Sequence, residues 1–347
     1  MEAQQPRCIA AGDLNALANA GLTLSRVGQY VAAADCYRKA LAINSRVPEI
    51  QLNLGLAEFK QGHFHEAIAS FRAVLMMEPD HSQARTLLGM SYYGAGMYKD
   101  AAQALAPSLT AQPANSELRY VLAQSCLWAG QYDCALKEFE QLAREKPDSA
   151  GVHILVAEAL DGQGMQNEAI AELQAAAAIA ASEPNVHFGL GYLLWKQGRD
   201  DEAEREFRLE LAHDPSHAKA YAWLGDIALR RGDAQAAKPL LEKALQLSPE
   251  IRVARLDLGK IYVQEGKNQQ AIVELRAAER LDPAREDAHY QLARICQQMG
   301  RRREAQAELA IVTRLHEKKE AQEKLYKISN QPPALPASDE NSRAPGR

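Results

Sequence analysis

Aromatic residues are scarce in this 347-residue chain, at 6% of the sequence, and runs in which Val, Ile or Thr alternate with polar residues are rare. The second absence argues against β-strands, which show that alternation. No segment approaches the roughly 18 consecutive apolar residues of a membrane-spanning helix. Alanine is abundant instead, together with Leu, Glu, Gln and Arg, and this mixture favours helices. The composition therefore predicts an all-α protein without membrane insertion.

A strong charge of either sign is also missing, because the formal net charge is only -5. A surface for nucleic acid would need a basic excess, so we expect no nucleic-acid partner. The N-terminal residues MEAQQPRCIAAGD lack the basic flank and apolar run of a signal peptide. We therefore expect a cytoplasmic protein, or a periplasmic or secreted one if a leader has been removed.

Paired cysteine motifs are absent as well. No C-x-x-C pair occurs, and five cysteines are an odd number, so neither a disulfide framework nor a zinc ribbon is indicated. Most of them fall within apolar helical patterns, where a reduced thiol packs as a small hydrophobic group. We expect structural thiols in a reducing compartment at Cys8, Cys36, Cys126, Cys134 and Cys296.

The sequence does contain a strict internal repeat of 34 residues. Alanine always follows the repeated glycine by five residues, and no insertion or deletion interrupts the nine periods. The glycines are Gly28, Gly62, Gly96, Gly130, Gly164, Gly198, Gly232, Gly266 and Gly300. The alanines are Ala33, Ala67, Ala101, Ala135, Ala169, Ala203, Ala237, Ala271 and Ala305. Such a period indicates a repeat architecture.

Other positions of the repeat are restricted too when each repeat begins fourteen residues before its glycine. Position 8 is always Gly or Ala, position 24 is large and apolar, and position 32 is proline in six of the nine repeats. The nine repeats are then 14–47, 48–81, 82–115, 116–149, 150–183, 184–217, 218–251, 252–285 and 286–319. Residues 1–13 form a lead-in before them.

Each restriction has a physical role in a pair of antiparallel helices. The glycine at position 15 supplies the left-handed conformation that ends the first helix. Small residues at positions 8 and 20 let the two helices approach closely, and proline at position 32 ends the second helix. One helix pair cannot bury its own apolar face, so neighbouring pairs must stack into a solenoid.

This pattern resembles the tetratricopeptide repeat (TPR) family over about nine-tenths of the chain. The resemblance rests on the period, the small residue at position 8, alanine at 20, the large apolar residue at 24 and proline at 32. It implies a right-handed α-solenoid, a superhelix of nine antiparallel helix-turn-helix units. It also implies that positions 2, 5, 6, 9, 12 and 13 of the first helices face the inside of the superhelix, where the family binds partners.

A few residues depart from the repeat. Glu317 replaces the terminating proline of the last repeat, so we expect a C-terminal capping helix over 320–329. Pro107 lies at position 26 and predicts a kink or an early helix end. Pro239 lies at position 22, where a late helix start would leave it in the tolerant first turn. The tail 330–347 is rich in Pro, Ser and charge and should be disordered.

No catalytic motif has the required spacing. GKIYVQEGKN is not a phosphate-binding loop, and GLGYLLWKQG lacks the third glycine of a dinucleotide fingerprint. The stretch GHFHEA places His63 and His65 at free positions of a hairpin, and His81 closes that repeat. His153, His187 and His289 share position 4, which favours packing over metal binding. We expect no catalytic residue, no cofactor and no metal.

The inward positions carry the most suggestive side chains. Trp128, Trp195 and Trp223 occupy positions 13, 12 and 6, and none is at position 4, where the family most often has a structural tryptophan. Aromatic anchors flanked by charges of both signs are typical of a protein-binding groove. The predicted groove also contains Tyr120, Phe188, Tyr192, Lys196, Asp226, Arg230, Lys260 and Tyr290. Tyr120, Phe188 and Tyr290 lie at position 5, where the alternative interpretation is ordinary packing.

Two subclasses of the family have characteristic residues on their first helices. The clamp that holds chaperone C-terminal carboxylates needs a lysine, an asparagine and an arginine where this sequence has Ala18, Leu22 and Leu87, so such a partner is not expected. Asn19 and Asn53 resemble the start of the asparagine ladder in O-linked N-acetylglucosamine transferases, and they form a possible secondary groove. The ladder ends at Leu87, and no glycosyltransferase domain follows in this sequence.

The sequence therefore favours a non-catalytic scaffold that binds a peptide or helix of a partner protein. The alternative is a substrate-recognition arm or subunit that works with a separate enzyme such as a glycosyltransferase. Metal-dependent hydrolysis centred on the histidines is a third hypothesis and the least favoured one.

Overall fold

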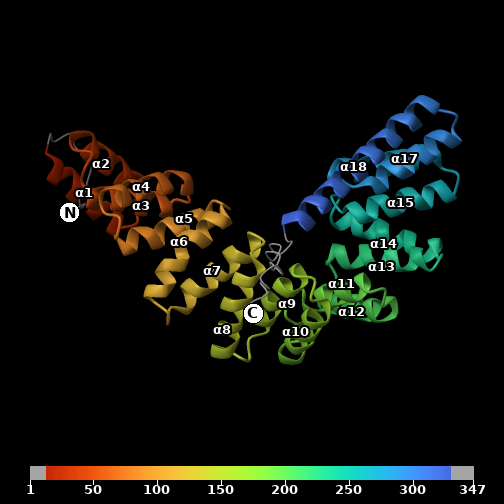
Figure 1. Cartoon of the computed structure of the whole chain (residues 1–347), viewed down its shortest axis with the longest axis horizontal. Coiled ribbons are helices and arrows are strands. Elements are labelled where there is room, and N and C mark those ends of the chain that lie inside the picture. Colours follow the sequence, from red (N-terminus) through yellow and green to blue (C-terminus); the bar gives the residue numbers. More distant parts are fainter. Residues whose placement is uncertain (1–12, 330–347) are drawn as a thin grey trace, which may run out of the picture. The chain divides into compact units, whose positions relative to one another are not determined.

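The computed structural model describes residues 13–329, and these form helices joined by short turns, without a β-strand. The helices follow one another in pairs along the chain (Figure 1). The first helices are α1 Leu14–Arg26, α3 Pro48–Lys60, α5 Ser82–Gly94, α7 Ser116–Trp128, α9 Ala150–Gly162, α11 Val186–Lys196, α13 Ala218–Arg230, α15 Arg252–Gln264 and α17 Glu286–Gln298. The second helices are α2 Tyr30–Ile43, α4 Phe64–Met77, α6 Tyr98–Ala111, α8 Tyr132–Glu145, α10 Gln166–Ile179, α12 Asp200–His213, α14 Ala234–Leu247, α16 Asn268–Leu281 and α18 Arg302–Ser329.

The chain divides into two compact bodies, residues 1–194 and residues 195–347. They are called the N-terminal body and the C-terminal body below, and each is described by itself. Within each body a helix packs against the next one along the chain, and first helices of consecutive repeats also touch, such as α3 with α5 and α13 with α15. The all-α solenoid expected from the repeat is confirmed. No helix in the described part of the chain is long and apolar enough to cross a membrane.

The turn between the two helices of a repeat is built around the glycine at position 15. Gly62 has a φ of 75°, and its N–H donates to the carbonyl of Phe59 at 3.0 Å. The N–H of His63 donates back to the carbonyl of Glu58 at 3.0 Å. These two bonds satisfy carbonyls that the end of α3 would otherwise leave unpaired, in the pattern of a Schellman motif. All nine repeated glycines have a positive φ.

The core of each repeat forms where position 8 meets position 24. A Cβ atom added at Gly55 would lie 2.7 Å from Cε1 of Phe71, which is fully buried. The alanine at position 20, Ala67 in this repeat, is also fully buried. Helix–helix contact therefore depends on a large side chain from the second helix lying directly on the backbone of the first.

A polar bridge between positions 4 and 23 joins the same two helices in four repeats. In each, a basic side chain of the first helix pairs with a glutamate of the second. The pairs are Arg119–Glu138 at 2.5 Å, His153–Glu172 at 2.6 Å, Arg255–Glu274 at 2.7 Å and His289–Glu308 at 2.7 Å. His153 and His289 are therefore ion-pair partners that replace arginine at position 4, a role that their pattern in the sequence did not reveal.

The two interior prolines behave differently from expectation. α6 continues through Pro107 to Ala111, and α14 begins at Ala234, so Pro239 lies beyond the first turn. The expected early end of α6 and late start of α14 are therefore wrong. Both prolines are exposed, so the backbone carbonyls that lose their helical partners, those of Gln103 and Gln235, lie on exposed residues that water can reach.

The last helix and the chain ends complete the description. α18 is one continuous helix to Ser329, so residues 320–329, expected as a capping helix, extend the second helix of the last repeat. The lead-in apart from Asp13, the position of Cys8 and the tail 330–347 lie outside the described residues.

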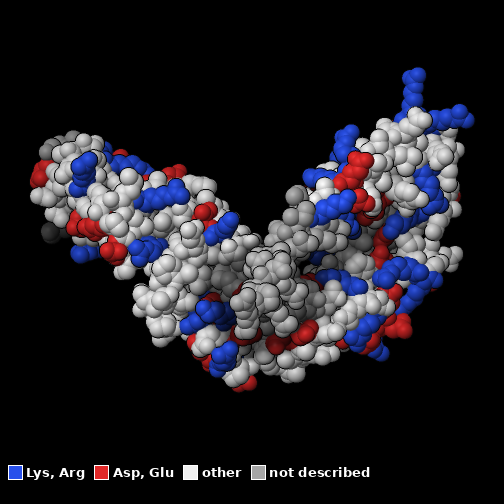
Figure 2. All heavy atoms as spheres, viewed as in Figure 1, with Lys and Arg blue, Asp and Glu red and all other residues white. Residues whose placement is uncertain are grey.

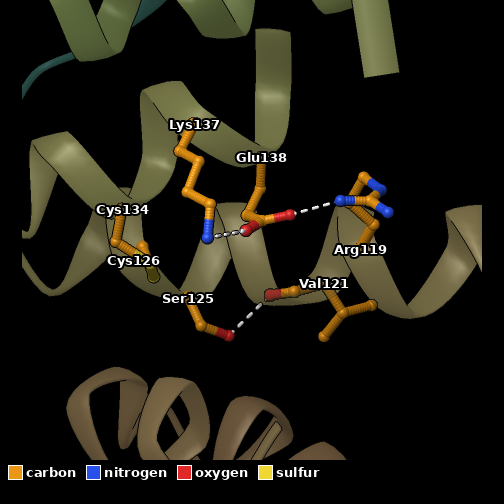
Figure 3. The surroundings of a disulfide bond; sticks show 7 residues. All are labelled: Arg119, Val121, Ser125, Cys126, Cys134, Lys137 and Glu138. Carbon is orange, nitrogen blue, oxygen red and sulfur yellow. Dashed lines mark hydrogen bonds and ion pairs between the residues drawn. A yellow bond between two sulfur atoms is a disulfide. The ribbon is translucent and has the colours of Figure 1, made fainter. Parts of the chain in front are cut away.

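The expectation of reduced cysteines is wrong in the fourth repeat, where Cys126 of α7 and Cys134 of α8 form a disulfide (Figure 3). Their Cα atoms are 5.8 Å apart although eight residues separate them in sequence. The helix hairpin turns at Gly130, midway between the two, and this brings positions 11 and 19 face to face. A search for C-x-x-C pairs could not detect this contact. Cys36 is disulfide-bonded as well, so the expectation is also wrong there, whereas Cys296 remains a free, buried thiol.

The contact between positions 8 and 24 generates a stability prediction. Gly55→Leu should lower the free energy of unfolding by about 3 kcal/mol, because the new side chain must displace Phe71 from a packed core. The matched change Gly151→Leu in α9 meets no atom within 4 Å of its Cβ. It should alter stability by less than about 1 kcal/mol. Urea titration followed by circular dichroism measures both, and equal effects would contradict the packing.

The polar bridge of His153 predicts a pH dependence. Burial lowers the pKa of His153, but the bonds to Glu172 and to the Pro147 carbonyl outweigh it and raise the pKa above 6.5. The bridge therefore stabilises fully below pH 6.5, and its contribution is lost as the pH rises through the raised folded value. The melting temperature should drop more for His153→Gln at pH 5.5 than at pH 9. His65→Gln, an exposed change in α4, should show no such difference.

The disulfide predicts that reduction loosens the fourth repeat. In the chain-entropy account, opening a loop of this size costs about 2 kcal/mol. Dithiothreitol should therefore lower the melting temperature of the wild type more than that of a Cys126→Ser, Cys134→Ser variant, in which the disulfide of Cys36 can still be reduced. An identical response of the two proteins to dithiothreitol would refute a stabilising role.

Candidate functional site

The side chains of the predicted groove lie in both bodies. Tyr120, Trp128, Phe188 and Tyr192 belong to the N-terminal body. Trp195, Lys196, Trp223, Asp226, Arg230, Lys260 and Tyr290 belong to the C-terminal body.

The C-terminal body contains a compact tryptophan pair. The rings of Trp195, at the end of α11, and Trp223 of α13 have centroids 4.2 Å apart and are tilted by 50°. The indole Nε1 of Trp195 donates to Oδ2 of Asp226 at 2.7 Å, and the guanidinium carbon of Arg230 lies 5.4 Å from the Trp195 ring centroid. Both tryptophans are half-buried. The pair is thus held in one orientation by a hydrogen bond and a cation–π contact.

Acidic and basic side chains near this pair form a network of ion pairs and hydrogen bonds. Arg230 pairs with Asp200 at 3.1 Å and with Asp226 at 3.8 Å, and Nζ of Lys260 donates to Asp257 at 2.7 Å. Asp257 is fully buried. Burial raises the pKa of Asp257 to about 7, with Lys260 opposing and the nearby Asp226 reinforcing the rise. Sequence reasoning missed Asp257, although it shares position 6 with Trp223, the inward position that could have signalled it.

Two further predicted residues of the C-terminal body are exposed. Lys196 ends α11, and Tyr290 of α17 is 52% exposed. Neither takes part in the contacts just described for the tryptophan pair.

The N-terminal body contains an aromatic cluster around Trp128. Tyr93 stacks on its ring at 5.5 Å with an angle of 21°, and Tyr98 lies at 4.8 Å. Tyr93 donates its hydroxyl to Gln124 at 2.5 Å, and Gln124 donates to the hydroxyl of Tyr120 at 2.9 Å. Tyr98 was not predicted because it lies at position 17, on a second helix, and Tyr93 was missed although it lies at position 12, one of the inward positions. Trp128 is still 49% exposed.

Phe188 and Tyr192 line a cavity of about 380 Å³ in the same body. Their rings are stacked with centroids 6.4 Å apart and an angle of 15°. The other lining residues come from α9, from α10, from the connection before α11 and from α11 itself. They are Ile154, Ala157, Glu158, Asp161, Leu173, Pro184, Asn185, Gly189 and Leu193. Most of the wall is apolar, with two carboxylates on α9.

The two asparagines of the possible secondary groove lie on neighbouring first helices. Asn19 of α1 is exposed and Asn53 of α3 is half-buried, and the next residue at their position is Leu87. The pair therefore does not continue into a ladder along the first helices.

The histidines of GHFHEA have ordinary surroundings. His63 and His65 are exposed at the start of α4, while Nδ1 of His81 accepts the N–H of Ala84 at 3.2 Å and caps α5. The residues that the structure describes include one group with the geometry to hold a metal ion, formed by Glu279, His289 and Glu308.

That group already contains a cation. Arg276 donates to Glu279 at 2.7 Å and pairs with Glu308 at 2.6 Å, so its guanidinium compensates part of the charge of the two carboxylates. The His289–Glu308 contact is also one of the four polar bridges between positions 4 and 23. We therefore interpret the group as structural.

Charge is mixed on the surface of both bodies. On the face shown in Figure 2, Lys and Arg alternate with Asp and Glu, and neither sign forms one continuous field. This distribution agrees with the small net charge of the chain.

Comparison with known families finds matches to the tetratricopeptide repeat. Sequence models with that description match residues 92–159, 52–116 and 188–250, and a further TPR repeat model matches 24–62 and 259–300. A comparison with curated protein sequences finds no match.

Solved structures with the same fold are distant in sequence. The APC/C hetero-tetramer Cut9–Hcn1 is 14% identical, with a TM-score of 0.58 over 92% of this chain and 76% of the other. A tetratricopeptide repeat protein from Parabacteroides merdae is 17% identical, with a TM-score of 0.52 over 72% of this chain and 98% of the other. The TPR protein YrrB, described as having an unusual peptide-binding site, is 21% identical, with a TM-score of 0.40 over 51% and 91%. The likeness to the first two structures shows the fold alone.

Proposed function

The chain belongs to the tetratricopeptide repeat family. On that basis we propose that it is a non-catalytic scaffold that binds a peptide or helix of a partner protein on the inward positions of its first helices. The observation that carries this proposal is the tryptophan pair Trp195 and Trp223. The pair is half-buried, oriented by Asp226 and Arg230, and placed at two positions that the repeat does not need for its core.

Such a pair has the properties of a binding hot spot. Tryptophan buries a large area on binding, and interface energy concentrates in a few aromatic and arginine side chains. Because Asp226 and Arg230 fix the Trp195 ring before a partner arrives, less side-chain entropy is lost on binding. The flanking charges would add specificity and orientation rather than most of the affinity.

The remaining predicted groove residues extend the proposal to the N-terminal body. Trp128 and Tyr120 share a hydrogen-bonded aromatic cluster, and Phe188 and Tyr192 line a cavity. These features support additional contacts for a long peptide. Asn19 and Asn53 support no peptide contacts beyond their own two helices.

The experiment is affinity capture with the wild type and with Trp195→Ala combined with Trp223→Ala. The captured partner should bind the double variant at least about 30-fold more weakly, since each hot-spot residue contributes about 2 kcal/mol. Helical content by circular dichroism should stay unchanged.

A matched control removes apolar area elsewhere on the same body. Val273→Ala combined with Leu281→Ala changes two exposed residues of α16 and should leave the affinity of the partner as in the wild type. Undiminished binding by the tryptophan variant, or equal loss in both variants, would refute the assignment.

A further inference from the structure

The cavity beside Phe188 and Tyr192 exists because the sixth repeat begins irregularly. The other eight first helices have 13 residues and begin at the first position of their repeat, whereas α11 has 11 residues and begins at the third. Pro184 and Asn185 occupy the two missing positions, and Asn185 has a left-handed φ of 67°. The missing half-turn leaves space next to α9.

Gly189 enlarges that space. It lies at position 6, where every other repeat has a side chain at least as large as that of aspartate. A Cβ atom added there would approach only Leu173, at 3.3 Å. The late helix start and this glycine together account for a cavity of about 380 Å³ whose walls are mostly apolar.

Two carboxylates line this cavity, so it is not purely apolar. Glu158 and Asp161 lie at positions 9 and 12 of α9, among the inward positions of the repeat, and both line the cavity. Glu158 remains exposed to solvent, but the cavity walls desolvate part of its carboxylate and raise its pKa. A cation entering the cavity would offset that cost.

We propose that this cavity receives a lysine or arginine side chain of the bound peptide, with the aliphatic stem against Leu173, Phe188 and Tyr192 and the cationic head at Glu158. The proposal rests on the proposed function and deepens it by naming one residue class of the partner. Long basic side chains combine an apolar stem with a charged end, and cations are also attracted by aromatic rings.

Other side chains fit less well. An acidic or phosphorylated side chain would be repelled by the two carboxylates. A purely apolar side chain would cover Glu158 without giving it a partner, which leaves a desolvated charge uncompensated. Charge complementarity therefore selects a basic residue.

The test uses a randomised library of twelve-residue peptides selected on the wild-type protein. Selected peptides should share one Lys or Arg position. Replacing that residue by norleucine, which keeps the aliphatic stem and removes the charge, should weaken binding to the wild type about 10-fold. The same replacement should have no effect on binding to Glu158→Gln. The control Glu168→Gln changes an exposed carboxylate of α10 and should retain the wild-type preference.

A second variant tests the cavity itself. Gly189→Met fills the space and should weaken every selected peptide at least 10-fold, whereas Gln174→Met, at an exposed residue of α10, should not. Equal binding of the lysine and norleucine peptides to the wild type would overturn the inference, as would a preference that persists in Glu158→Gln. If selected peptides depend on Trp195 and Trp223 but not on Glu158, only this inference fails. If they depend on none of the three, the proposed function fails as well.

Discussion

The close approach of two helices within each repeat is the constraint on which the rest of the structure depends. Phe71 and its counterparts rest on a first-helix backbone that has only Gly or Ala at position 8. The left-handed glycine at position 15 returns the chain at the angle that this contact requires. Because positions 8, 15, 20 and 24 are committed to packing, the inward positions are free to vary, and there the tryptophans and the buried aspartates are found.

Polar bridges add a second layer to this packing. The pairs at positions 4 and 23 connect the same two helices whether the basic residue is arginine, as in Arg119, or histidine, as in His153. The disulfide of the fourth repeat lies close to one of these bridges (Figure 3) and joins the same helices at positions 11 and 19. A side chain that looks like a metal ligand in isolation, such as His289, is thus explained by its place in the repeat.

Much of the fold could be predicted from the sequence, because the repeat period places every glycine turn and the packing residues follow from it. What could not be predicted depends on contacts across the hairpin. Cys126 and Cys134 meet only when α7 and α8 are placed together, and position 6 could have marked Asp257 as inward but not as fully buried. Pro107 and Pro239 break a local rule but face water, so neighbouring packing keeps their helices intact. The cavity depends on the backbone of Asn185, which no motif signals.

The central claim is that inward positions of the first helices form the partner-binding surface. A crystal structure of the protein with a selected peptide tests it most directly. The account predicts that the peptide contacts Trp195 and Trp223 and lies against first helices. A peptide seated instead on the second helices, away from both tryptophans, would contradict it.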